Sequence, residues 1–589
     1  MIPFPCMLKE ITPVTRRYAS LVVLTGLFFV PHQMYPQNNL TTRNALSNDQ
    51  VQGIIQESEQ KIQSILEKEI YLPGLSIALV SRDRTLWAAG FGYRDRSRSA
   101  RVDTNTIFGV LSVSKPITVT GLMMAVQDGL LDLDVPVKRY LPSFTIHSRS
   151  SVDPMSEITL RHLISMTSGL THDAPLGNNS DAYSPSYEEH IRSFSQTWMR
   201  FRTGERAEYS GLGTELAAYC LEQVTHEPFT GYIQRRLFDP LGMKRSTYSI
   251  HKITSDTNRA TGNNKNIERV PVEIPMLAPA GVYASIADMA RFVRFHLDQG
   301  RVEGRTLLTE ELVNQMQTIP FPLQDQISGY GQGLWVRYYH LGGQEVRSVE
   351  HGGGGFGFLS QMKWLPDLGY GVVVLTNSSD QDYGQERLTE DILMKIVELL
   401  TGRQNAGPSD WLKDHVPPRS VDTTSLPANF AGRYSGTSDD MVFLVKNGRF
   451  GYASGNTFEP LTPVSPLEYM SKRYVYRFVV DPEGMPVSVV RPYDGMVWLV
   501  GSGATEVKGQ EKKEWSHYTG SYIRKRFGVG ERFYNVSVHN GWLHFIGGGQ
   551  DLRLTEHMPG LFFTPDGEAV DFRGTTATYR NIKLYKVCQ

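Results

Sequence analysis

Two β-strand patterns that lie far apart in the chain constrain its fold more than any other feature. Residues 75–93, LSIALVSRDRTLWAAGFGY, hold two β-rich runs around a polar turn, and residues 358–377, FLSQMKWLPDLGYGVVVLTN, repeat this pattern. Apolar residues at helical spacing predict helices over 49–70 and 386–400, and the segment between the two hairpins is mostly helical. Since distant strands can share one antiparallel sheet with helices packed on it, the sequence predicts an α+β domain of about 350 residues.

The rest of the chain requires further domains, because 589 residues exceed what a single hydrophobic core supports. The predicted α+β domain occupies residues 47–403. Residues 404–425 are rich in Pro, Ser and charge and predict a linker. After this linker the helical period disappears, and short β-rich runs alternate with turn signals.

The C-terminal part of the chain contains an internal duplication. Phe430-x-Gly432-x-Tyr434 recurs as Tyr518-x-Gly520-x-Tyr522, and each copy is followed by an Asn-Gly turn and later by a Pro-x-Gly turn. The repeat predicts two similar antiparallel barrel-like units, at residues 426–505 and 513–588.

Charge and cysteine content exclude several classes of protein. Lys and Arg number 60 against 61 Asp and Glu, so the chain lacks the basic field that nucleic-acid binding needs. The three cysteines, Cys6, Cys220 and Cys588, are widely separated and do not have the spacing of a zinc or redox motif. We therefore expect no nucleic-acid partner, no metal and no cofactor.

The N-terminal 34 residues have the features of an export signal. Lys9, Arg16 and Arg17 precede a 13-residue apolar run, residues 18–30, which is short for a membrane span. The following PHQMYPQNNLTT lacks the Ala-x-Ala pattern of a cleavage site, so an uncleaved membrane anchor stays open as an alternative. The expected location is secreted or periplasmic, with membrane association through this segment if it is retained.

The segment GVLSVSKP, residues 109–116, places Ser112 three positions before Lys115 at the start of a predicted helix. Residues three apart share a helix face, so the amine can reach the hydroxyl and accept its proton once burial lowers the pKa of the lysine. The helix N-terminus also favours the negative charge that develops on the serine. By itself the spacing is weak evidence, because an ordinary helix start with Ser114 as its cap has the same sequence.

The surrounding segments decide between these alternatives. GVLSVSKPITVTGLMMAVQDGLLDLDVPVKRYLP resembles the nucleophile segment of class C β-lactamases and penicillin-binding-protein-like serine hydrolases. ITLRHLISMTSGL, the segment around YSG, GYGQGLWV and VEHGGGGFGFLSQMKWLPDLGYGVVVLTN resemble further segments of that family, in its order. The resemblance covers about residues 50–400 and implies a β-lactamase/transpeptidase-like fold with an antiparallel sheet and a helical subdomain.

The resemblance also implies catalytic roles. Ser112 corresponds to the acylated nucleophile and Lys115 to its proton acceptor. Tyr209 of YSG occupies the position of a tyrosine that shuttles a proton to the leaving group, although a half-buried core tyrosine would be the ordinary interpretation without the flanking match. His351 opens HGG at the position of the lysine in the Lys-Thr-Gly motif of β-lactamases, where it offers a weaker cation near neutral pH.

The glycine run after His351 is expected to line the cleft. The resemblance implies that the backbone N–H groups of Ser112 and Gly354 form the oxyanion hole, and that Gly352 and Gly353 contact substrate. The second motif departs from the family, because Gly211 stands where β-lactamases and D-peptidases have the Asn of Tyr-x-Asn. We expect Gly211 at the substrate site, and the missing amide shifts the prediction towards ester substrates.

These observations predict a secreted serine hydrolase that forms an acyl-enzyme on Ser112 and acts on small esters or amides. Two alternatives stay open, a D-amino-acid peptidase or carboxypeptidase acting on wall-type short peptides and a catalytically idle protein that binds cell-wall fragments. The paired β units are similar in arrangement to the D-aminopeptidase branch, in which a loop of a barrel domain can restrict the cleft. FIGGGQDL, residues 545–552, is a candidate for that loop, although an ordinary hairpin turn is the preferred interpretation.

Overall fold

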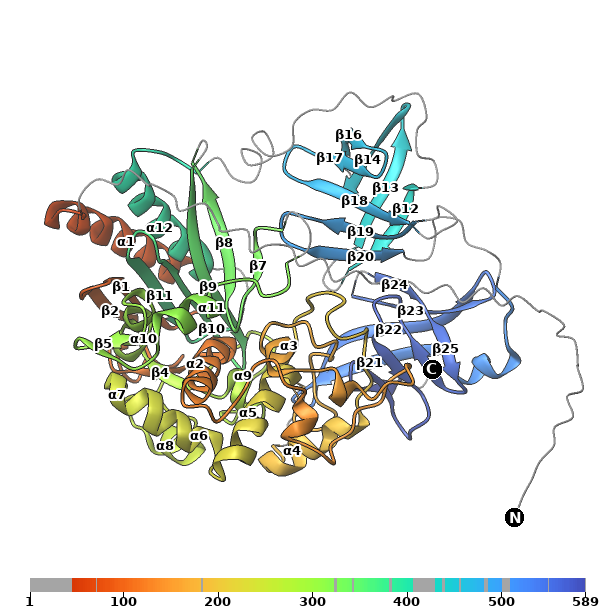
Figure 1. Cartoon of the computed structure of the whole chain (residues 1–589), viewed down its shortest axis with the longest axis horizontal. Coiled ribbons are helices and arrows are strands. Elements are labelled where there is room, and N and C mark those ends of the chain that lie inside the picture. Colours follow the sequence, from red (N-terminus) through yellow and green to blue (C-terminus); the bar gives the residue numbers. More distant parts are fainter. Residues whose placement is uncertain are drawn as a thin grey trace, which may run out of the picture. The chain divides into compact units, whose positions relative to one another are not determined.

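The computed structural model describes residues 45–587 apart from 70, 179, 182–183, 323–325, 342–343, 381–383, 406–429, 437–439, 455–456, 481–485, 501–508 and 549. Figure 1 shows a mixed region of helices and strands, followed in the chain by two β units. We refer to residues 45–405 as the N-terminal unit, to residues 430–500 as barrel unit 1 and to residues 509–587 as barrel unit 2. The predicted signal segment and most of the predicted linker lie outside the described residues.

A seven-stranded antiparallel sheet forms the centre of the N-terminal unit, in the order β2-β1-β11-β10-β9-β8-β7. The first strand of the chain, β1, pairs with the last strand of this unit, β11. Leu75 lies opposite Thr376, and Ser81 lies opposite Tyr370. This pairing confirms the predicted sheet built from distant strands. Its strands are β1 (Gly74–Ser81), β2 (Thr85–Gly92), β7 (Gly329–Tyr330), β8 (Trp335–His340), β9 (Glu345–Gly355), β10 (Phe358–Leu365) and β11 (Tyr370–Thr376).

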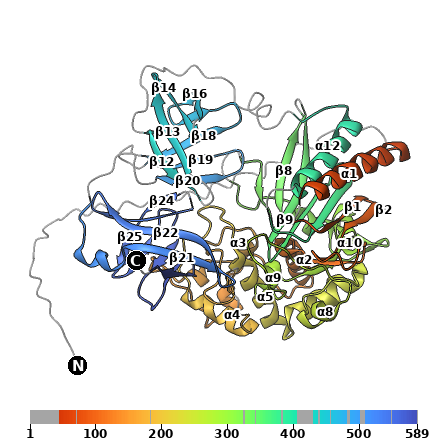
Figure 2. The same ribbon diagram turned by 180° about the vertical axis from the view of Figure 1, so that it is seen from behind.

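Helices cover both faces of this sheet. Helices α1 (Asn48–Lys68) and α12 (Gln385–Thr401) lie side by side on one face, in both views of the molecule (Figures 1 and 2), and α12 contacts β10 and β11. Helix α10 (Ile286–Leu297) packs against β1, β2, β10 and β11. The apolar stripe of each helix is buried against the sheet, as amphipathic spacing requires.

The segment between β2 and β7 forms the helical subdomain. Helix α2 (Ser114–Gln127) is buried from Ser114 to Ala125 and packs against α5 and α9, so it is the central helix of this region. The other elements are β3 (Ile107–Gly109), the 3-10 turn η1 (Leu111–Val113), α3 (Leu160–Ile164), α4 (Tyr187–Ser193), α5 (Gly211–Thr225), α6 (Phe229–Ile233), α7 (Asp239–Leu241), α8 (Ile250–Ser255), α9 (Leu277–Ala280), β4 (Tyr283–Ser285), β5 (Arg301–Val302), β6 (Arg305–Thr306) and α11 (Glu310–Met316).

The two barrel units have the same topology. Barrel unit 1 has the strand order β15-β14-β13-β12-β20-β19-β18-β17-β16, and barrel unit 2 has the matching order β24-β23-β22-β21-β29-β28-β27-β26-β25. Their strands are β12 (Gly432–Ser435), β13 (Asp440–Lys446), β14 (Arg449–Ser454), β15 (Thr457–Pro460), β16 (Thr462–Ser465), β17 (Glu468–Met470), β18 (Val475–Val480), β19 (Pro486–Arg491) and β20 (Met496–Val500), then β21 (Gly520–Arg526), β22 (Val529–His539), β23 (Trp542–Gly547), β24 (Gln550–Arg553), β25 (Thr555–Met558), β26 (Leu561–Phe563), β27 (Ala569–Asp571), β28 (Ala577–Tyr579) and β29 (Ile582–Lys586).

The duplicated motif makes the same contact in both barrel units. The Tyr434 hydroxyl donates to the Phe430 carbonyl at 3.0 Å, and the Tyr522 hydroxyl donates to the Tyr518 carbonyl at 2.7 Å. The Asn-Gly turns follow as predicted, with positive φ at both residues of each turn. These two nearly closed antiparallel sheets, together with the mixed N-terminal unit, confirm the predicted fold class.

Across the described residues, we find no helix that is both long enough and apolar enough to cross a membrane.

Candidate active site

Ser112 lies on a strained turn between a strand and the central helix. After β3 the chain enters η1, where Leu111 has a positive φ of 50°, an unfavourable conformation for a branched side chain. Helix α2 begins at Ser114, but the Ser114 hydroxyl accepts the N–H of Val282 at 3.0 Å and no side chain caps the helix. The alternative of an ordinary helix start capped by Ser114 therefore does not describe this segment.

Lys115 is buried beside Ser112. Its Nζ lies 3.3 Å from Ser112 Oγ, 3.3 Å from the Pro279 carbonyl and 4.6 Å from the ring centre of Tyr209. The lysine is 2% exposed, and burial lowers its pKa to about 7, while the carboxylates of Glu215 and Asp173 oppose this shift. A substantial fraction of the amine is therefore neutral at physiological pH and able to accept a proton.

Tyr209 reaches the same point from the segment that precedes α5. Ser210 caps that helix by accepting the N–H of Gly213, which fixes the direction in which the chain enters it. Burial raises the pKa of Tyr209, and its hydrogen bond with Ser112 only partly opposes this shift. The phenol is therefore protonated at neutral pH. Its ring stacks on His172, with the ring centres 5.5 Å apart.

His351 lies on β9 close to Tyr209, with 6.1 Å between the ring centres. Its Nδ1 lies 2.7 Å from the Gly352 carbonyl and its Nε2 lies 3.0 Å from the Tyr330 hydroxyl, so Nδ1–H donates and Nε2 accepts. Burial and the nearby Lys115 lower the pKa of His351 to about 3. The imidazole is thus neutral and bonded to Tyr330, in place of the cationic lysine of Lys-Thr-Gly.

The glycine run of β9 lies against the nucleophile turn. A Cβ on Gly353 would lie 2.4 Å from the Val110 carbonyl oxygen and 3.0 Å from the Ser112 nitrogen, so only glycine permits this approach. Gly354 is exposed, and a Cβ on Gly352 would lie 2.7 Å from a side-chain oxygen of Gln361. Among the described residues, β8 pairs with β9 only as far as Glu350, which leaves this edge of the glycine run without a strand neighbour.

Gly211 lies next to His172 and Pro279, which contact Tyr209 and Lys115. It is the first residue of α5 and is buried, and a Cβ there would lie 2.9 Å from the His172 carbonyl oxygen. The space next to Gly211 is therefore occupied by the backbone at His172, and a larger residue would require this segment to move.

Sequence reasoning missed four residues that surround the catalytic group. Tyr330 bonds His351, His172 stacks on Tyr209, and the carboxylates of Glu215 and Asp173 act on Lys115. Tyr330 lies in the GYGQGLWV segment, and Glu215 follows Gly211 by one helical turn. Either signal could have been read from the sequence, whereas His172 and Asp173 lie in a loop without a pattern.

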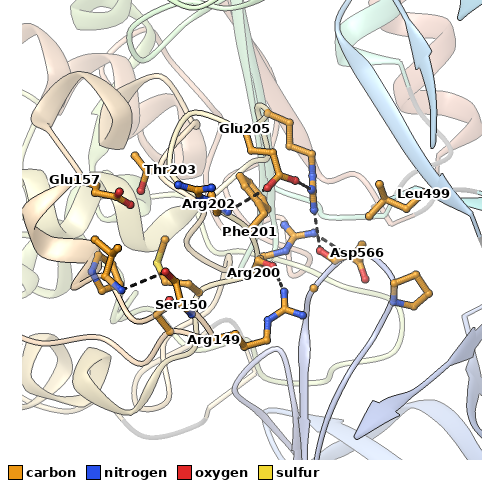
Figure 3. Close-up of a pocket in the computed structure, with 17 residues that line it drawn as sticks. Arg149, Ser150, Glu157, Arg200, Phe201, Arg202, Thr203, Glu205, Leu499 and Asp566 are labelled. Atoms are coloured by element: carbon orange, nitrogen blue, oxygen red, sulfur yellow. Dashed lines mark hydrogen bonds and ion pairs between the residues drawn. The ribbon is translucent and has the colours of Figure 1, made fainter. Parts of the chain in front are cut away.

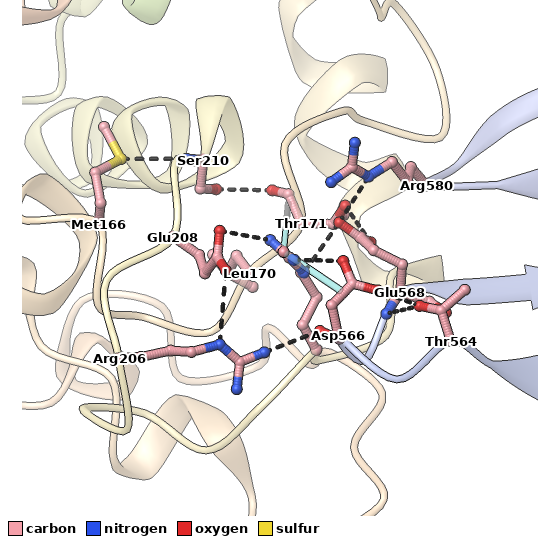
Figure 4. A network of polar contacts seen from close by, with 12 residues as sticks. Met166, Leu170, Thr171, Arg206, Glu208, Ser210, Thr564, Asp566, Glu568 and Arg580 are labelled. Atoms are coloured by element: carbon pink, nitrogen blue, oxygen red, sulfur yellow. Dashed lines mark hydrogen bonds and ion pairs between the residues drawn. The ribbon is translucent and has the colours of Figure 1, made fainter. Parts of the chain in front are cut away.

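Barrel unit 2 is joined to the second motif by a buried group of charges that we call the ionic cluster (Figure 4). The Arg200 guanidinium, with a 1% exposed side chain, lies 2.9 Å from carboxylate oxygens of both Asp566 and Glu568. It also lies 3.6 Å from Glu208, the residue before Tyr209. The members of the cluster are Arg200, Arg206, Glu208, Asp566, Glu568 and Arg580.

A chain of hydrogen bonds continues from the ionic cluster to the residue next to Tyr209. The Thr171 hydroxyl donates to Glu568 Oε2 at 2.8 Å, and the Ser210 hydroxyl donates to the Thr171 carbonyl at 2.7 Å. A turn of barrel unit 2 therefore supports the segment that presents the phenol.

A cavity of about 370 Å³ lies beside the ionic cluster (Figure 3). Its lining includes Arg149, Arg200, Arg206 and Asp566, and it includes none of the four predicted catalytic residues. The guanidinium of Arg149 donates to the Arg200 carbonyl at 2.7 Å and lies 4.3 Å from the ring centre of Phe563. This cavity belongs to the junction with barrel unit 2 and not to the serine site.

Within the part of the chain that the structure describes, no three His, Cys, Asp or Glu side chains are grouped so that they could hold a metal ion.

Known proteins resemble this chain in sequence or in fold. Protein flp of Staphylococcus aureus (strain MW2) is 23% identical over 351 residues, covering 58% of this chain and 66% of that protein, so the chain spans just under two thirds of the length of these relatives. The unguisins hydrolase ungD of Aspergillus violaceofuscus (strain CBS 115571) is 24% identical over 389 residues, covering 59% and 67% of the two chains. The crystal structure of SurE with D-Leu matches 77% of this chain and all of that chain with a TM-score of 0.54 at 17% identity, a likeness of fold.

The family model for Beta-lactamase matches residues 60–393, which is more than half of the chain and includes Ser112, Lys115, Tyr209 and His351. Together with the sheet order and the helical subdomain, this match confirms the resemblance found in the sequence: the chain belongs to the β-lactamase family of serine hydrolases.

Proposed function

We propose that this protein is a serine hydrolase that forms an acyl-enzyme on Ser112 and acts on small esters, with amides as poorer substrates. The contact between Lys115 Nζ and Ser112 Oγ carries this proposal, because a buried amine with a pKa of about 7 can accept the hydroxyl proton. Membership of the β-lactamase family supports the same chemistry.

Acylation begins when Ser112 Oγ attacks the substrate carbonyl and its proton passes to Lys115 Nζ. The carbonyl oxygen then carries the negative charge, and we assign the backbone N–H groups of Ser112 and Gly354 to stabilise it. Collapse of the tetrahedral intermediate breaks the bond to the leaving group, which takes a proton from the Tyr209 phenol while the phenol regains one from Lys115. Water then attacks the acyl carbonyl and gives its proton to Tyr209 and Lys115. The bond to Ser112 Oγ breaks, the serine regains a proton from Lys115, and the acid is released.

The neutral His351 supports the preference for esters. A substrate of a D-carboxypeptidase carries a carboxylate, which the lysine of Lys-Thr-Gly can pair with in other family members, whereas this imidazole stays uncharged near pH 7 and is bonded to Tyr330. The Tyr-x-Asn amide is also replaced by Gly211. Both changes remove groups that would hold a peptide.

Labelling with a fluorophosphonate tests the nucleophile. The wild-type protein should gain an adduct that mass spectrometry maps to Ser112, and Ser112→Ala should lose both the adduct and the turnover of a 4-nitrophenyl ester while its circular dichroism stays unchanged. Ser114→Ala is the matched control and should keep the adduct. A folded wild-type protein without an adduct on Ser112 would favour the idle binding protein.

The choice of substrate is tested by comparing a 4-nitrophenyl ester with a D-alanyl amide. We expect a higher kcat/KM for the ester, and a higher value for the amide would favour the D-peptidase.

For location we propose export, supported by the basic and apolar N-terminal segment, and detection of the protein only in the cytoplasmic fraction would contradict it.

A further inference from the structure

A hairpin of barrel unit 2 approaches the end of the glycine run beside the serine site, and it is not FIGGGQDL, the candidate named from the sequence. The candidate FIGGGQDL forms the hairpin of β23 and β24, where Gln550 donates to Gly436 of barrel unit 1. The hairpin of β21 and β22 instead contacts the N-terminal unit. The Phe527 N–H donates to the Ser180 carbonyl at 3.0 Å, and the Arg524 guanidinium donates to the Ser180 hydroxyl at 2.9 Å.

The tip of this hairpin meets the end of the glycine run. The ring centres of Phe527 and Phe356 are 5.0 Å apart, and Phe527 packs on the main hydrophobic core of the N-terminal unit. A Cβ placed on Gly355 would lie 3.5 Å from Arg526 Nη2 and 3.8 Å from Leu111 Cδ1. Since Leu111 directly precedes the nucleophile, the half-buried Arg526 lies near the turn that carries Ser112.

The positions of the acid-base groups indicate which part of a substrate meets Arg526. The leaving group must receive its proton from Tyr209, and this phenol lies at the His351 end of the glycine run. With the carbonyl oxygen held at Gly354, the acyl chain then extends in the opposite direction, towards Gly355. The acyl chain, and not the leaving group, therefore approaches the guanidinium.

We infer that Arg526 makes this enzyme selective for acyl groups that carry a carboxylate a few bonds from the reactive carbonyl. This inference rests on the proposed function of Ser112. A guanidinium presents a planar fork of donors that matches a carboxylate, and its partial burial strengthens the pair. The same charge repels the free α-amine of an aminopeptidase substrate, which disfavours that activity.

Phe527 and Arg524, on either side of this residue, hold the hairpin through their contacts with Ser180 and the core, so we expect the hairpin to stay docked when Arg526 is replaced. Substitution of Arg526 should therefore change selectivity and leave the hairpin in place. Lys525 provides a matched control, since it is an exposed cation on the same hairpin whose Nζ lies 4.8 Å from the ring centre of Tyr585.

The experiment compares kcat/KM for mono-4-nitrophenyl glutarate with that for 4-nitrophenyl valerate, which has the same chain length and no acyl carboxylate. Wild type and Lys525→Ala should prefer the glutarate. Arg526→Gln should lower kcat/KM for the glutarate about tenfold or more, the usual loss for one charge-assisted hydrogen bond, and should change the valerate value less than about twofold. Arg526→Lys should recover part of the preference, and Arg526→Glu should reduce it further.

Equal losses on both esters in Arg526→Gln, or an unchanged preference for the glutarate, would overturn the inference while valerate turnover and the Ser112 adduct still support the proposed function. Failure of the wild-type protein to turn over either ester, together with no adduct on Ser112, would reject the proposed function and this inference with it.

Discussion

The two barrel units share one topology and one tyrosine contact, yet they are joined to the N-terminal unit by different chemistry. Barrel unit 1 uses Tyr493, whose carbonyl accepts the N–H of Ser328 at 2.9 Å and whose hydroxyl lies 2.9 Å from His340 Nε2. Barrel unit 2 inserts the carboxylates of Asp566 and Glu568 into the buried ionic cluster. The same fold thus provides a hydrogen-bonded contact through one tyrosine in one copy and an ionic contact in the other.

The difference arises in the loops that each barrel unit turns towards the N-terminal unit, because the side chains of the strands pack into the core of their own barrel unit. In barrel unit 2 the loop between β26 and β27 carries the acids and the β21–β22 hairpin carries Arg524 and Arg526. Ser328, which contacts barrel unit 1, lies two residues before Tyr330, the partner of His351. Glu208, which belongs to the ionic cluster with barrel unit 2, directly precedes Tyr209. Both copies therefore support a segment that ends at the serine site, and we expect the ionic contact to matter more.

The largest expected effect comes from Arg200→Leu. This change leaves the carboxylates of Asp566 and Glu568 buried without their main cation, which costs about 3–5 kcal/mol of stability. Urea unfolding followed by tryptophan fluorescence measures the loss. Arg573→Leu removes an ion pair within barrel unit 2 that is partly exposed and should cost about 1 kcal/mol or less. Equal losses in the two variants would contradict the importance of the ionic cluster.

A smaller effect is expected from Thr171→Val, which removes the hydroxyl that bonds Glu568 and keeps the shape of the side chain. The Ser210 segment then loses one of its links to barrel unit 2, and we expect kcat on a 4-nitrophenyl ester to fall about tenfold because Tyr209 is less well placed. KM should change little. Thr401→Val is the matched control, because the Thr401 hydroxyl bonds the Val397 carbonyl within α12. This variant should leave kcat unchanged. A rise in KM at constant kcat would contradict a positioning role.

The tyrosine contact of barrel unit 1 should be weaker. Tyr493→Phe removes the hydroxyl near His340 and keeps the ring, so we expect a loss of about 1 kcal/mol in urea unfolding. The kcat of this variant should match that of wild type. A loss as large as that of Arg200→Leu would show that the two contacts are energetically alike.

The smallest expected effect is a shift in pH dependence. Because Lys115 must be deprotonated to act as a base, kcat/KM should rise with pH through about 7. Asp173 raises the pKa of Lys115, so Asp173→Asn should move this limb of the profile to lower pH. The shift should be modest, since Glu215 is the larger of the two carboxylate contributions. A limb that moves to higher pH would contradict the assignment of Lys115 as the base.

Asp173 also sharpens the comparison of the barrel units. Its carbonyl accepts the Asn581 amide of barrel unit 2 at 2.7 Å, and its pKa is lowered by His172, Arg524 and Arg580. Two of these three residues, Arg524 and Arg580, come from barrel unit 2. Tyr493→Phe should therefore leave the pH profile of kcat/KM unchanged. A shift as large as that of Asp173→Asn would show that both barrel units influence Lys115.

Much of the fold follows from local patterns. Alternating β-rich runs around polar turns predict β1 with β2 and β10 with β11, and helical spacing predicts α1 and α12. The repeated Gly-x-Tyr motif identifies the duplication because its tyrosine makes the same local hydrogen bond in both copies. Each of these features depends on residues that are close in the chain.

The sequence by itself predicted the meeting of Ser112 and Lys115, because side chains three positions apart share a helix face, and their polar atoms lie 3.3 Å apart although Ser112 belongs to η1 and only Lys115 to α2. Only the tertiary structure decided how that pair is tuned. Three contacts join residues from separate strands and units. They are the hydrogen bond between the neutral His351 and Tyr330, the hydrogen bond from Thr171 to Glu568, and the approach of Arg526 to Gly355. Such contacts depend on how whole sheets and barrel units pack, and no local spacing in the chain records that packing.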